Sequence, residues 1–399
     1  MTQAAARPRL EVADILRVHG EDYQRTHSLS AAQRTVMRHI AECRTAALGG
    51  HVDRCDACER VRISYNSCRD RHCPKCQNLK KAEWLEARRQ HLLPTRYWHL
   101  VFTLPDALRP LALRNKPQLF GLLFECAAQT LQTIARDTKH LGAQLGFTAI
   151  LHTWGQKLQF HPHLHCVVTG GGLDSRGDRW VRARPRFFLP VKVLARLFRG
   201  KFLHRLQELH QQDKLDLAGS AVALVDPAAW HRLLNQLYRT EWLVYAKPPF
   251  GGPDHVFRYL GRYTHRVAIA NHRLIALQHG EVRFHYRDYA DGDRKKILGL
   301  SAAEFIRRFL LHVLPRGFVR IRHYGLLAAR NIHTKLDAAR NLLRTPKHED
   351  DPEVDLPWWQ RLLRLTGIDL MLCPYCHQGR LIRTQLAIGT TTIGRGPPP

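Results

Sequence analysis

The sequence predicts an α+β protein in which a helical, cysteine-rich N-terminal part precedes a larger mixed part. Short apolar strand patterns alternate with amphipathic helix patterns through the middle of the 399-residue chain, an order typical of the α+β class. Two CxxC pairs lie close together before that region and indicate a module held by metal. The length is sufficient for two or three domains with at least one sizeable core.

The N-terminal part begins with a predicted helix. Ser30 and Gln33 form a capping-box pattern, and Val36, Ile40 and Cys43 follow at helical spacing. Gly49-Gly50 is expected to end this helix. A cysteine-rich stretch then covers residues 51–77, and a second helix is predicted from about residue 80 to residue 93, before Pro94.

The mixed part contains three strand patterns, two long helices, a hairpin and two shorter helices. The strands are expected at 97–104, 147–154 and 163–169, the last ended by Gly170-Gly171-Gly172. The long helices are expected at 117–137 and 191–211. Asp254 can cap a helix to about Arg266, residues 273–277 and 282–286 flank a turn, and Ser301 with Glu304 caps a helix to residue 314.

The charge of the chain points to a polyanionic partner. Lysine and arginine number 62 against 34 acidic residues, a net charge of +28 spread along the whole length, which favours binding to DNA or RNA. No apolar run is long enough to span a membrane, and the N-terminus lacks the apolar stretch of a secretory signal. CxxC pairs without a secretory signal indicate metal sites in a reducing compartment, so a cytoplasmic location is expected.

The cysteines predict zinc. Cys55, Cys58, Cys73 and Cys76 supply four thiolates, a set that suits a tetrahedral zinc ion. Three further side chains could replace one of them or hold a second ion: Cys68, His51 and His72. Cys373-Pro-Tyr-Cys376 is half a site, which could be completed by the N-terminal group, completed in an oligomer, or left without metal. Three isolated cysteines are expected to be ordinary buried thiols: Cys43, Cys126 and Cys166.

The cysteine-rich stretch is also strongly basic. Arg69, Arg71 and Lys75 lie among its zinc ligands, together with Arg54, Arg60 and Arg62. A metal-stapled module with this charge is expected to contact DNA phosphates, although a purely structural module with a solvated basic face is the alternative.

The segment Phe160-His-Pro-His-Leu-His-Cys is the most informative in the chain. Alternate side chains of a strand share a face, so His163 and His165 point the same way and can hold a divalent metal. Four side chains are candidates for a third ligand: Gln156, Gln159, His161 and His265.

A tyrosine pair provides the second element. Tyr259 and Tyr263 are four residues apart and share one face of the predicted helix, bordered by Arg262 and Arg266. A phenol with a pKa near 10 needs help to attack a phosphodiester at neutral pH. A metal held by the histidines can polarise the phosphate, and the arginines can hold its oxygens. The energy of the broken bond would then be kept in a phosphotyrosine link.

These motifs resemble those of two-tyrosine HUH rolling-circle transposases of bacterial insertion sequences, the insertion-sequence ninety-one group, with an N-terminal zinc-binding domain. The resemblance covers about residues 30–335 and rests on four segments: YNSCRDRHCPKCQ, HPHLH, YLGRY and RHYGLLAARN. It implies an RRM-like HUH nuclease core whose histidine strand is central in an antiparallel sheet. It also implies nicking and rejoining of single-stranded DNA through 5′-phosphotyrosine intermediates, catalytic Mg²⁺ or Mn²⁺, and hairpins near the transposon ends as partners alongside target DNA.

The resemblance implies that His163 and His165 are the HUH pair and that Tyr259 and Tyr263 are the nucleophiles. The predicted domains are a helical segment over 1–50, a zinc-binding domain over 51–95, a nuclease domain over 96–335, and a segment over 336–399 with the CPYC knuckle and a disordered tail. A bacterial, nucleoid-associated protein is expected. A plasmid replication initiator or relaxase with the same chemistry, and a non-catalytic zinc-dependent DNA-binding regulator, are the alternatives.

Overall fold

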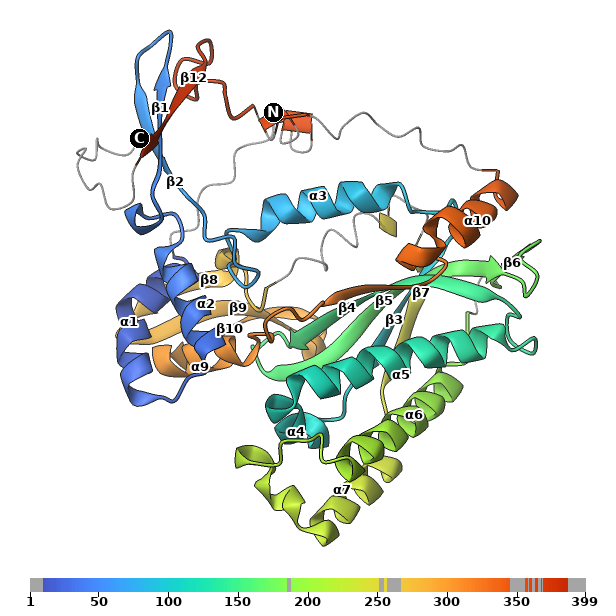
Figure 1. The fold of residues 1–399 in the computed structure, drawn as a ribbon. Coiled ribbons are helices and arrows are strands. Elements are labelled where there is room, and N and C mark those ends of the chain that lie inside the picture. The colour runs from blue at the N-terminus through green and yellow to red at the C-terminus, as the bar shows by residue number, and fades with distance from the viewer. Residues whose placement is uncertain are drawn as a thin grey trace. The chain divides into compact units, whose positions relative to one another are not determined.

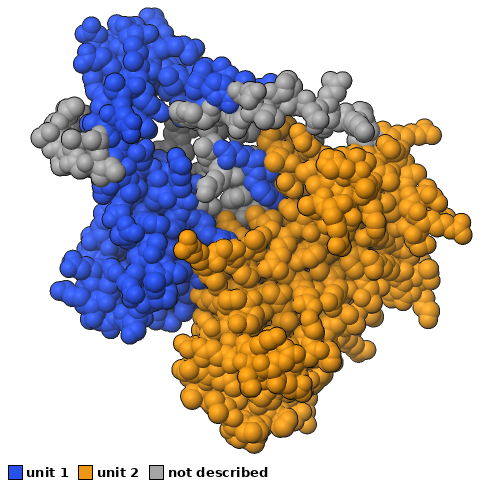
Figure 2. Space-filling model, viewed as in Figure 1, with its two compact units in different colours: residues 1–84, 265–313, 349–399 blue, residues 85–264, 314–348 orange. Residues whose placement is uncertain are grey.

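A computed structural model describes residues 10–184, 188–250, 255–256, 267–344, 356–357, 359–360, 363–364, 367 and 369–386. The chain forms two compact units (Figure 2): residues 1–84, 265–313 and 349–399 make the first, and residues 85–264 and 314–348 make the second. The expected domain division at residues 50, 95 and 335 stays a prediction.

The first unit combines helices with two small antiparallel sheets. Helices α1 (Val12–Thr26) and α2 (Ala31–Glu42) pack together, and α1 also packs on α9 (Ala302–Leu311). One sheet has the order β12-β1-β2, with β1 at Gly50–Cys55, β2 at Val61–Tyr65 and β12 at Leu381–Leu386. The other has the order β10-β9-β8, with β8 at Leu274–Gln278, β9 at Glu281–Asp288 and β10 at Arg294–Ser301.

The helix caps predicted for this unit are confirmed. The Ser30 side chain accepts a hydrogen bond from the Gln33 backbone N–H, and the Gln33 side chain accepts one from Ser30. Ser301 caps α9 by accepting from the Glu304 backbone N–H. Because each cap satisfies an N–H that the helix leaves without a partner, local sequence determines where these helices begin.

The second unit is built on an antiparallel sheet of order β11-β4-β5-β3-β7, with the short β6 (Trp180–Arg182) paired to β5. Its main strands are β3 (Tyr97–Thr103), β4 (Gln144–Trp154), β5 (Phe160–Leu173), β7 (Val244–Phe250) and β11 (Ile321–Gly325). Helices α5 (Lys116–Arg136) and α6 (Val191–Gln211) cover one face of this sheet (Figure 1). The histidine strand β5 therefore lies in the middle, between β4 and β3.

Four further helices complete the description. Helix α3 (Gln77–Arg89) begins earlier and ends earlier than the predicted 80–93. Helices α4 (Arg109–Arg114), α7 (Pro227–Arg239) and α10 (Asp337–Leu342) belong to the second unit. The helix predicted from Asp254 to Arg266 lies outside the described residues, apart from residues 255–256.

The prediction that the three glycines end the histidine strand is wrong. Strand β5 continues through them to Leu173. A Cβ at Gly170 would lie 2.6 Å from the Arg96 carbonyl oxygen, and one at Gly171 would lie 2.5 Å from the Val181 carbonyl oxygen. These glycines allow neighbouring backbone to approach closely within the sheet, which is the other common reason for glycine in a strand.

The two faces of the larger sheet differ sharply. Leu164, Cys166 and Val168 of β5 are buried on the face that α5 covers. His163 and His165 point to the opposite face, where the register places His163 beside His152 of β4 and Thr103 of β3. The α+β class with antiparallel sheets is thus confirmed, and strand alternation gathers polar side chains on the face opposite the helices.

Candidate metal centres

The cysteines of the first unit form two groups of four. Cys43, Cys68, Cys73 and Cys76 make one group, and Cys55, Cys58, Cys373 and Cys376 make the other. Within each group the sulfur atoms lie within 4.8 Å of one another. Both groups therefore have the number and type of ligands that a structural zinc ion requires.

The separations fit tetrahedral coordination. The measured Sγ–Sγ distances are 3.5 Å for Cys43–Cys76, 3.6 Å for Cys68–Cys76 and 3.7 Å for Cys43–Cys73. They are 3.7 Å for both Cys55–Cys376 and Cys58–Cys373. Four sulfurs at about 2.3 Å from one zinc ion would lie about 3.8 Å apart.

The structure does not bring the four expected ligands into one site. Cys55 and Cys58 join the C-terminal knuckle, whereas Cys73 and Cys76 join Cys43 and Cys68. The reason is the sheet β12-β1-β2, which pairs Cys55 of β1 with Leu381 of β12 and so brings the distant CPYC knuckle to the first CxxC pair. Cys373 and Cys376 could be completed by the N-terminal group, completed in an oligomer, or left without metal. In the structure the N-terminal pair Cys55 and Cys58 completes them.

The structure also corrects the expectations for Cys43 and for the two histidines of this region. Cys43, expected to be an ordinary buried thiol, is a member of the first group because α2 ends beside Cys76. His72 belongs to neither group, and its Nδ1 atom lies 3.0 Å from Oδ1 of Asp70. His51 is likewise in neither group.

Backbone N–H groups surround the second cysteine group. The N–H groups of Ala57 and Cys58 point at Cys55 Sγ, each at 3.4 Å, and the N–H of Gly379 points at Cys376 Sγ at 3.4 Å. Such donors stabilise thiolates, the form that binds metal. A Cβ at position 379 would collide with Cys55 Sγ, so the knuckle requires glycine there.

In the first group, hydrogen bonds from the thiols of Cys43, Cys68 and Cys73 lower the pKa of Cys76. Among the basic residues expected to contact DNA here, Lys75 forms an ion pair with Glu11, and its side chain is only 16% exposed. Burial lowers the pKa of Arg71, and Arg69 is exposed. Arg69 is therefore the most accessible of the three.

A third group lies on the polar face of the larger sheet. His152, His163 and His165 each offer a ring nitrogen, and these nitrogens lie within 4.8 Å of one another. The Nε2 atoms of His163 and His165 are 3.1 Å apart. Two nitrogens that bind one ion at about 2.0–2.1 Å lie about 3 Å apart, so this pair is spaced for a shared metal.

The surroundings prepare these rings for metal binding. Nδ1 of His163 lies 2.7 Å from the His161 carbonyl oxygen, so a proton on Nδ1 donates to that carbonyl and leaves the Nε2 lone pair available. Burial lowers the pKa of His163 to about 4, so this ring is neutral at pH 7. His152 stacks on Trp154, with ring centroids 4.6 Å apart.

A fourth histidine supports the group from β3. The Nε2 atom of His99 lies 2.9 Å from Nδ1 of His165, and both side chains are buried. Burial, followed by the charges of Lys247 and His163, lowers the pKa of His99 to about 3. His99 is thus a neutral neighbour that fixes the orientation of the His165 ring.

The third histidine of this group is His152, whereas His161 and Gln159, two of the expected third ligands, have other contacts. The His161 side chain faces Asp106, with 3.9 Å between Nδ1 and Oδ1, and Gln159 Oε1 accepts from the Lys157 N–H. Gln156 stays a candidate, and His265 lies outside the described residues. Tyr259, Tyr263, Arg262 and Arg266 also lie outside the described residues.

Comparison with known proteins agrees with these sites. Residues 15–104 match a family model described as "Transposase zinc-binding domain", and residues 146–335 match one described as "Putative transposase". The first match contains the Cys43 group together with Cys55 and Cys58, and the second contains the histidine group. Fold, sites and matches together define a zinc-binding transposase.

Two relatives cover almost the whole chain. "Putative transposase y4qJ" of Sinorhizobium fredii (strain NBRC 101917 / NGR234) is 52% identical over 98% of this chain and 98% of its own length. "Transposase for insertion sequence element IS801" of Pseudomonas savastanoi pv. phaseolicola is 29% identical over 90% of this chain and 85% of its own length. The chain belongs to the IS91 family of transposases. No solved structure matches it.

As a transposase, the protein acts on DNA, in agreement with its net charge of +28. Among the described helices, none combines the length and the apolar character needed to cross a bilayer.

Proposed function

We propose that the protein nicks single-stranded DNA at transposon ends and rejoins it through 5′-phosphotyrosine intermediates, within an RRM-like HUH core. The histidine group carries the proposal. His163 and His165, two residues apart on the central strand, converge with 3.1 Å between their Nε2 atoms, and His152 completes a three-nitrogen site. Imidazoles that converge in this way are typical metal ligands.

The donor set fits a divalent transition metal. Three imidazoles suit Mn²⁺ or a zinc-like ion better than Mg²⁺, which prefers oxygen ligands, so we propose Mn²⁺ before Mg²⁺. His152, His163 and His165 would hold the ion, and His99 would orient His165. When bound, the ion would polarise the scissile phosphate and stabilise its developing negative charge.

We propose Tyr259 and Tyr263 as the nucleophiles. The phenol oxygen of one tyrosine attacks phosphorus, and the bond between phosphorus and the 3′ oxygen breaks. The phenol loses its proton and the leaving 3′ oxygen gains one, so the 5′ end stays covalently bound to the protein. Attack on this link by a 3′ hydroxyl of another end reverses the step and joins the strands.

The remaining parts of the proposal concern DNA. Arg262 and Arg266 would hold phosphate oxygens next to the tyrosines, and Arg69, Arg71 and Lys75 would contribute to DNA binding by the zinc module. Hairpins at transposon ends and target DNA are the proposed partners, and a bacterial cytoplasm, close to the nucleoid, is the proposed location.

The test is a nicking assay on end-labelled single-stranded DNA that contains a transposon end. Wild-type protein should cut with added Mn²⁺ and should not cut with EDTA. The double variant His163→Ala/His165→Ala should bind the DNA and fail to cut it. His204→Ala is the matched control, because His204 of α6 is exposed and pairs with Glu208 of its own helix. Metal-independent cutting, or full cutting by the double variant, would refute the proposal.

A further inference from the structure

A cluster of two arginines and three histidines lies in the second unit, apart from the group of His152, His163 and His165. Each member comes from a different place in the chain: Arg88 from the end of α3, His91 from the turn after it, His323 from strand β11, His333 from the segment leading into α10, and Arg340 from α10. Burial lowers the pKa of His91 to about 4, and the charges of Arg88, Arg340 and His333 lower it further. Burial, then Arg88 and His91, lower the pKa of His323 to about 4. These groups therefore lie within electrostatic range of one another.

Arg88 is partly buried, and among the described residues no carboxylate forms an ion pair with it. Its Nε atom is buried and, within the part of the chain that the structure describes, has no hydrogen-bond partner. Burial alone lowers the pKa of Arg88, with no contribution from a carboxylate. A guanidinium stays protonated in a protein, so this charge persists. A buried Nε–H group without an acceptor is unfavourable, and an anion at this partly exposed guanidinium would satisfy it.

Arg340 supplies a second positive charge, and His91, neutral at pH 7, supplies a ring nitrogen. Nδ1 of His91 is buried and, among the described residues, also lacks a partner. Arg340 forms an ion pair with Asp337 at 2.8 Å and donates to the Gln90 carbonyl, which holds its side chain beside His91. Among the described residues, the two arginines of the cluster thus have one carboxylate, that of Asp337, as an ion-pair partner.

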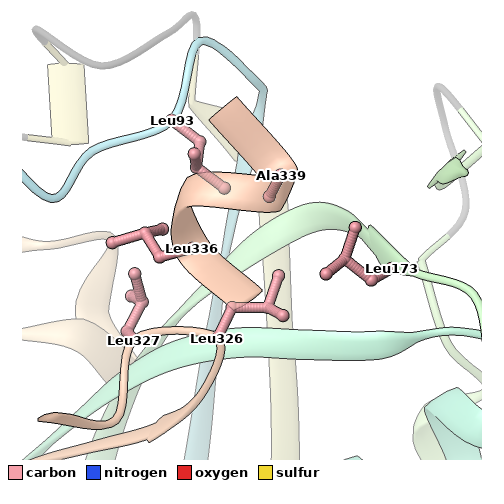
Figure 3. Packing of buried hydrophobic residues seen from close by; sticks show 6 residues of the cluster. All are labelled: Leu93, Leu173, Leu326, Leu327, Leu336 and Ala339. Carbon is pink, nitrogen blue, oxygen red and sulfur yellow. The ribbon is translucent and has the colours of Figure 1, made fainter. Parts of the chain in front are cut away.

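An apolar cluster makes this arrangement rigid (Figure 3). Leu93, two residues after His91, is fully buried against Leu326, Leu327, Leu336 and Ala339, with Leu173 of β5 beside them. In the sequence, Leu336 directly precedes Asp337 and Ala339 directly precedes Arg340. Packing therefore fixes the turn after α3 against α10 before any ligand arrives, and such preorganisation favours binding.

The cluster adjoins the polar face of the larger sheet. Nδ1 of His323 lies 2.9 Å from Oγ1 of Thr148, and the two residues are paired across β11 and β4. Thr148 and His152 lie on one face of β4, four residues or about 13 Å apart. Successive nucleotides of a stacked strand advance about 3.4 Å. The cluster thus begins about four nucleotides from the histidine group.

We propose that Arg88, His91 and Arg340 form a second phosphate-binding site, which holds the backbone of the single-stranded DNA several nucleotides from the scissile phosphate. This inference rests on the proposed function for the identity of the strand. Its chemistry, a phosphodiester held by two guanidiniums and an imidazole, rests on the cluster alone.

The test measures the affinity of a fluorescent oligothymidylate by anisotropy at several salt concentrations. Replacing Arg88→Gln should weaken binding about ten- to hundredfold. It should also reduce the slope of log affinity against log salt by about 0.7 for each phosphate that the variant no longer neutralises. Arg88→Lys keeps the charge and should restore the slope. Arg136→Gln is the matched control, an exposed arginine at the end of α5, and should leave the slope unchanged. Thermal unfolding of each variant checks that the fold is retained.

Two further measurements, thermal melting with inorganic phosphate and the nicking assay, separate a site for free anions from a DNA contact and test the proposed function independently. Inorganic phosphate should raise the melting temperature of the wild type more than that of Arg88→Gln. If phosphate does so while the salt slope is the same in both proteins, the site binds free anions and the proposed DNA contact is wrong. Equal slopes and equal phosphate effects would overturn the site altogether. The nicking assay tests the proposed function separately: wild-type protein that never nicks would refute that function, and a reduced slope in Arg88→Gln would still support the phosphate site.

Discussion

Replacing both cysteines of the C-terminal knuckle, Cys373→Ser and Cys376→Ser, should remove one of two zinc ions and release strand β12. The structure joins these cysteines to Cys55 and Cys58, at Sγ distances of 3.7 Å. The other cysteine group shares no ligand with this one. Zinc content should therefore fall from two ions per chain to one.

The expected release of β12 follows from the small number of apolar side chains that this sheet buries. The apolar cluster there consists of Cys55, Cys373 and Leu381, with Cys58 and Cys376 packed against it. Burying one leucine contributes about 1.5–3 kcal/mol, whereas ordering the six residues of β12 costs about 6–12 kcal/mol at 1–2 kcal/mol each. A structural zinc site contributes about 10–16 kcal/mol in apparent terms. Only the metal is large enough to offset the ordering cost.

One ion-pair network also links this sheet, but its contribution is smaller. Asp53 of β1 is fully buried and binds Arg62 of β2 and Arg383 of β12, at 3.0 and 2.7 Å. When β12 leaves, Asp53 keeps Arg62 and gains water. Losing one partner therefore costs far less than losing the zinc.

The assay combines metal analysis with hydrogen exchange. Wild-type protein should contain two zinc ions per chain, and the variant should contain one. Amides of the peptide covering residues 381–386 should exchange rapidly in the variant, while those of α5 should stay protected. Cys126→Ala, a substitution of a buried cysteine outside both groups, is the control and should retain two zinc ions. A variant that keeps two zinc ions and a protected β12 would refute the reasoning.

Other predictions concern catalysis and pH. His152→Ala should weaken Mn²⁺ binding at least tenfold in a metal titration, with DNA binding unchanged; wild-type metal affinity would show that His152 is not a ligand. A single Tyr→Phe change at Tyr259 or Tyr263 should leave some nicking and block complete transposition, and normal transposition by either single variant would make that tyrosine dispensable. Hydrogen bonds from Arg307 lower the pKa of Glu304 to about 2, below the unfolded value of about 4.3. The stability that Glu304 contributes should thus be complete above about pH 4.3 and disappear as the pH falls towards 2. Melting of Glu304→Gln against wild type from pH 6 to pH 2 measures this, and a constant difference would contradict it.

Most strands and helices could be predicted because their signals are local. Side-chain alternation was enough to place His163 and His165 on one face of a strand, and the Ser30 and Ser301 caps marked the starts of α2 and α9. The sequence could also have indicated His152, the proposed third ligand. A short connection between the strands predicted at 147–154 and 163–169 is consistent with a hairpin, and that pairing sets His152 opposite His163.

The grouping of the cysteines could not be predicted from spacing. Cys55 and Cys58 have CxxC partners at two places in the sequence, and both pairs carry the same donors. Which of these two pairs joins Cys55 and Cys58 depends on the pairing of β12 with β1, a contact between residues more than three hundred positions apart. Cys43 lies outside any CxxC motif, so only the position of α2 makes it a ligand. Long-range pairing of this kind leaves no local pattern.

The phosphate cluster illustrates the same limit. Arg88 and Arg340 resemble any of the 62 basic residues in the chain. What distinguishes Arg88 is a buried Nε atom with no carboxylate partner among the described residues, which depends on how α10 packs against Leu93.

Covalent capture of DNA tests the proposed chemistry most directly. Single-stranded DNA containing a transposon end and labelled on the 3′ side of the nick is incubated with protein and Mn²⁺, then run on a denaturing gel. Wild-type protein should carry the label, because the 5′ phosphate stays bound to a tyrosine. The double variant Tyr259→Phe/Tyr263→Phe keeps both rings and loses only the phenol oxygens, so it should bind the DNA and carry no label. Labelled double variant would contradict the assignment of these tyrosines as nucleophiles.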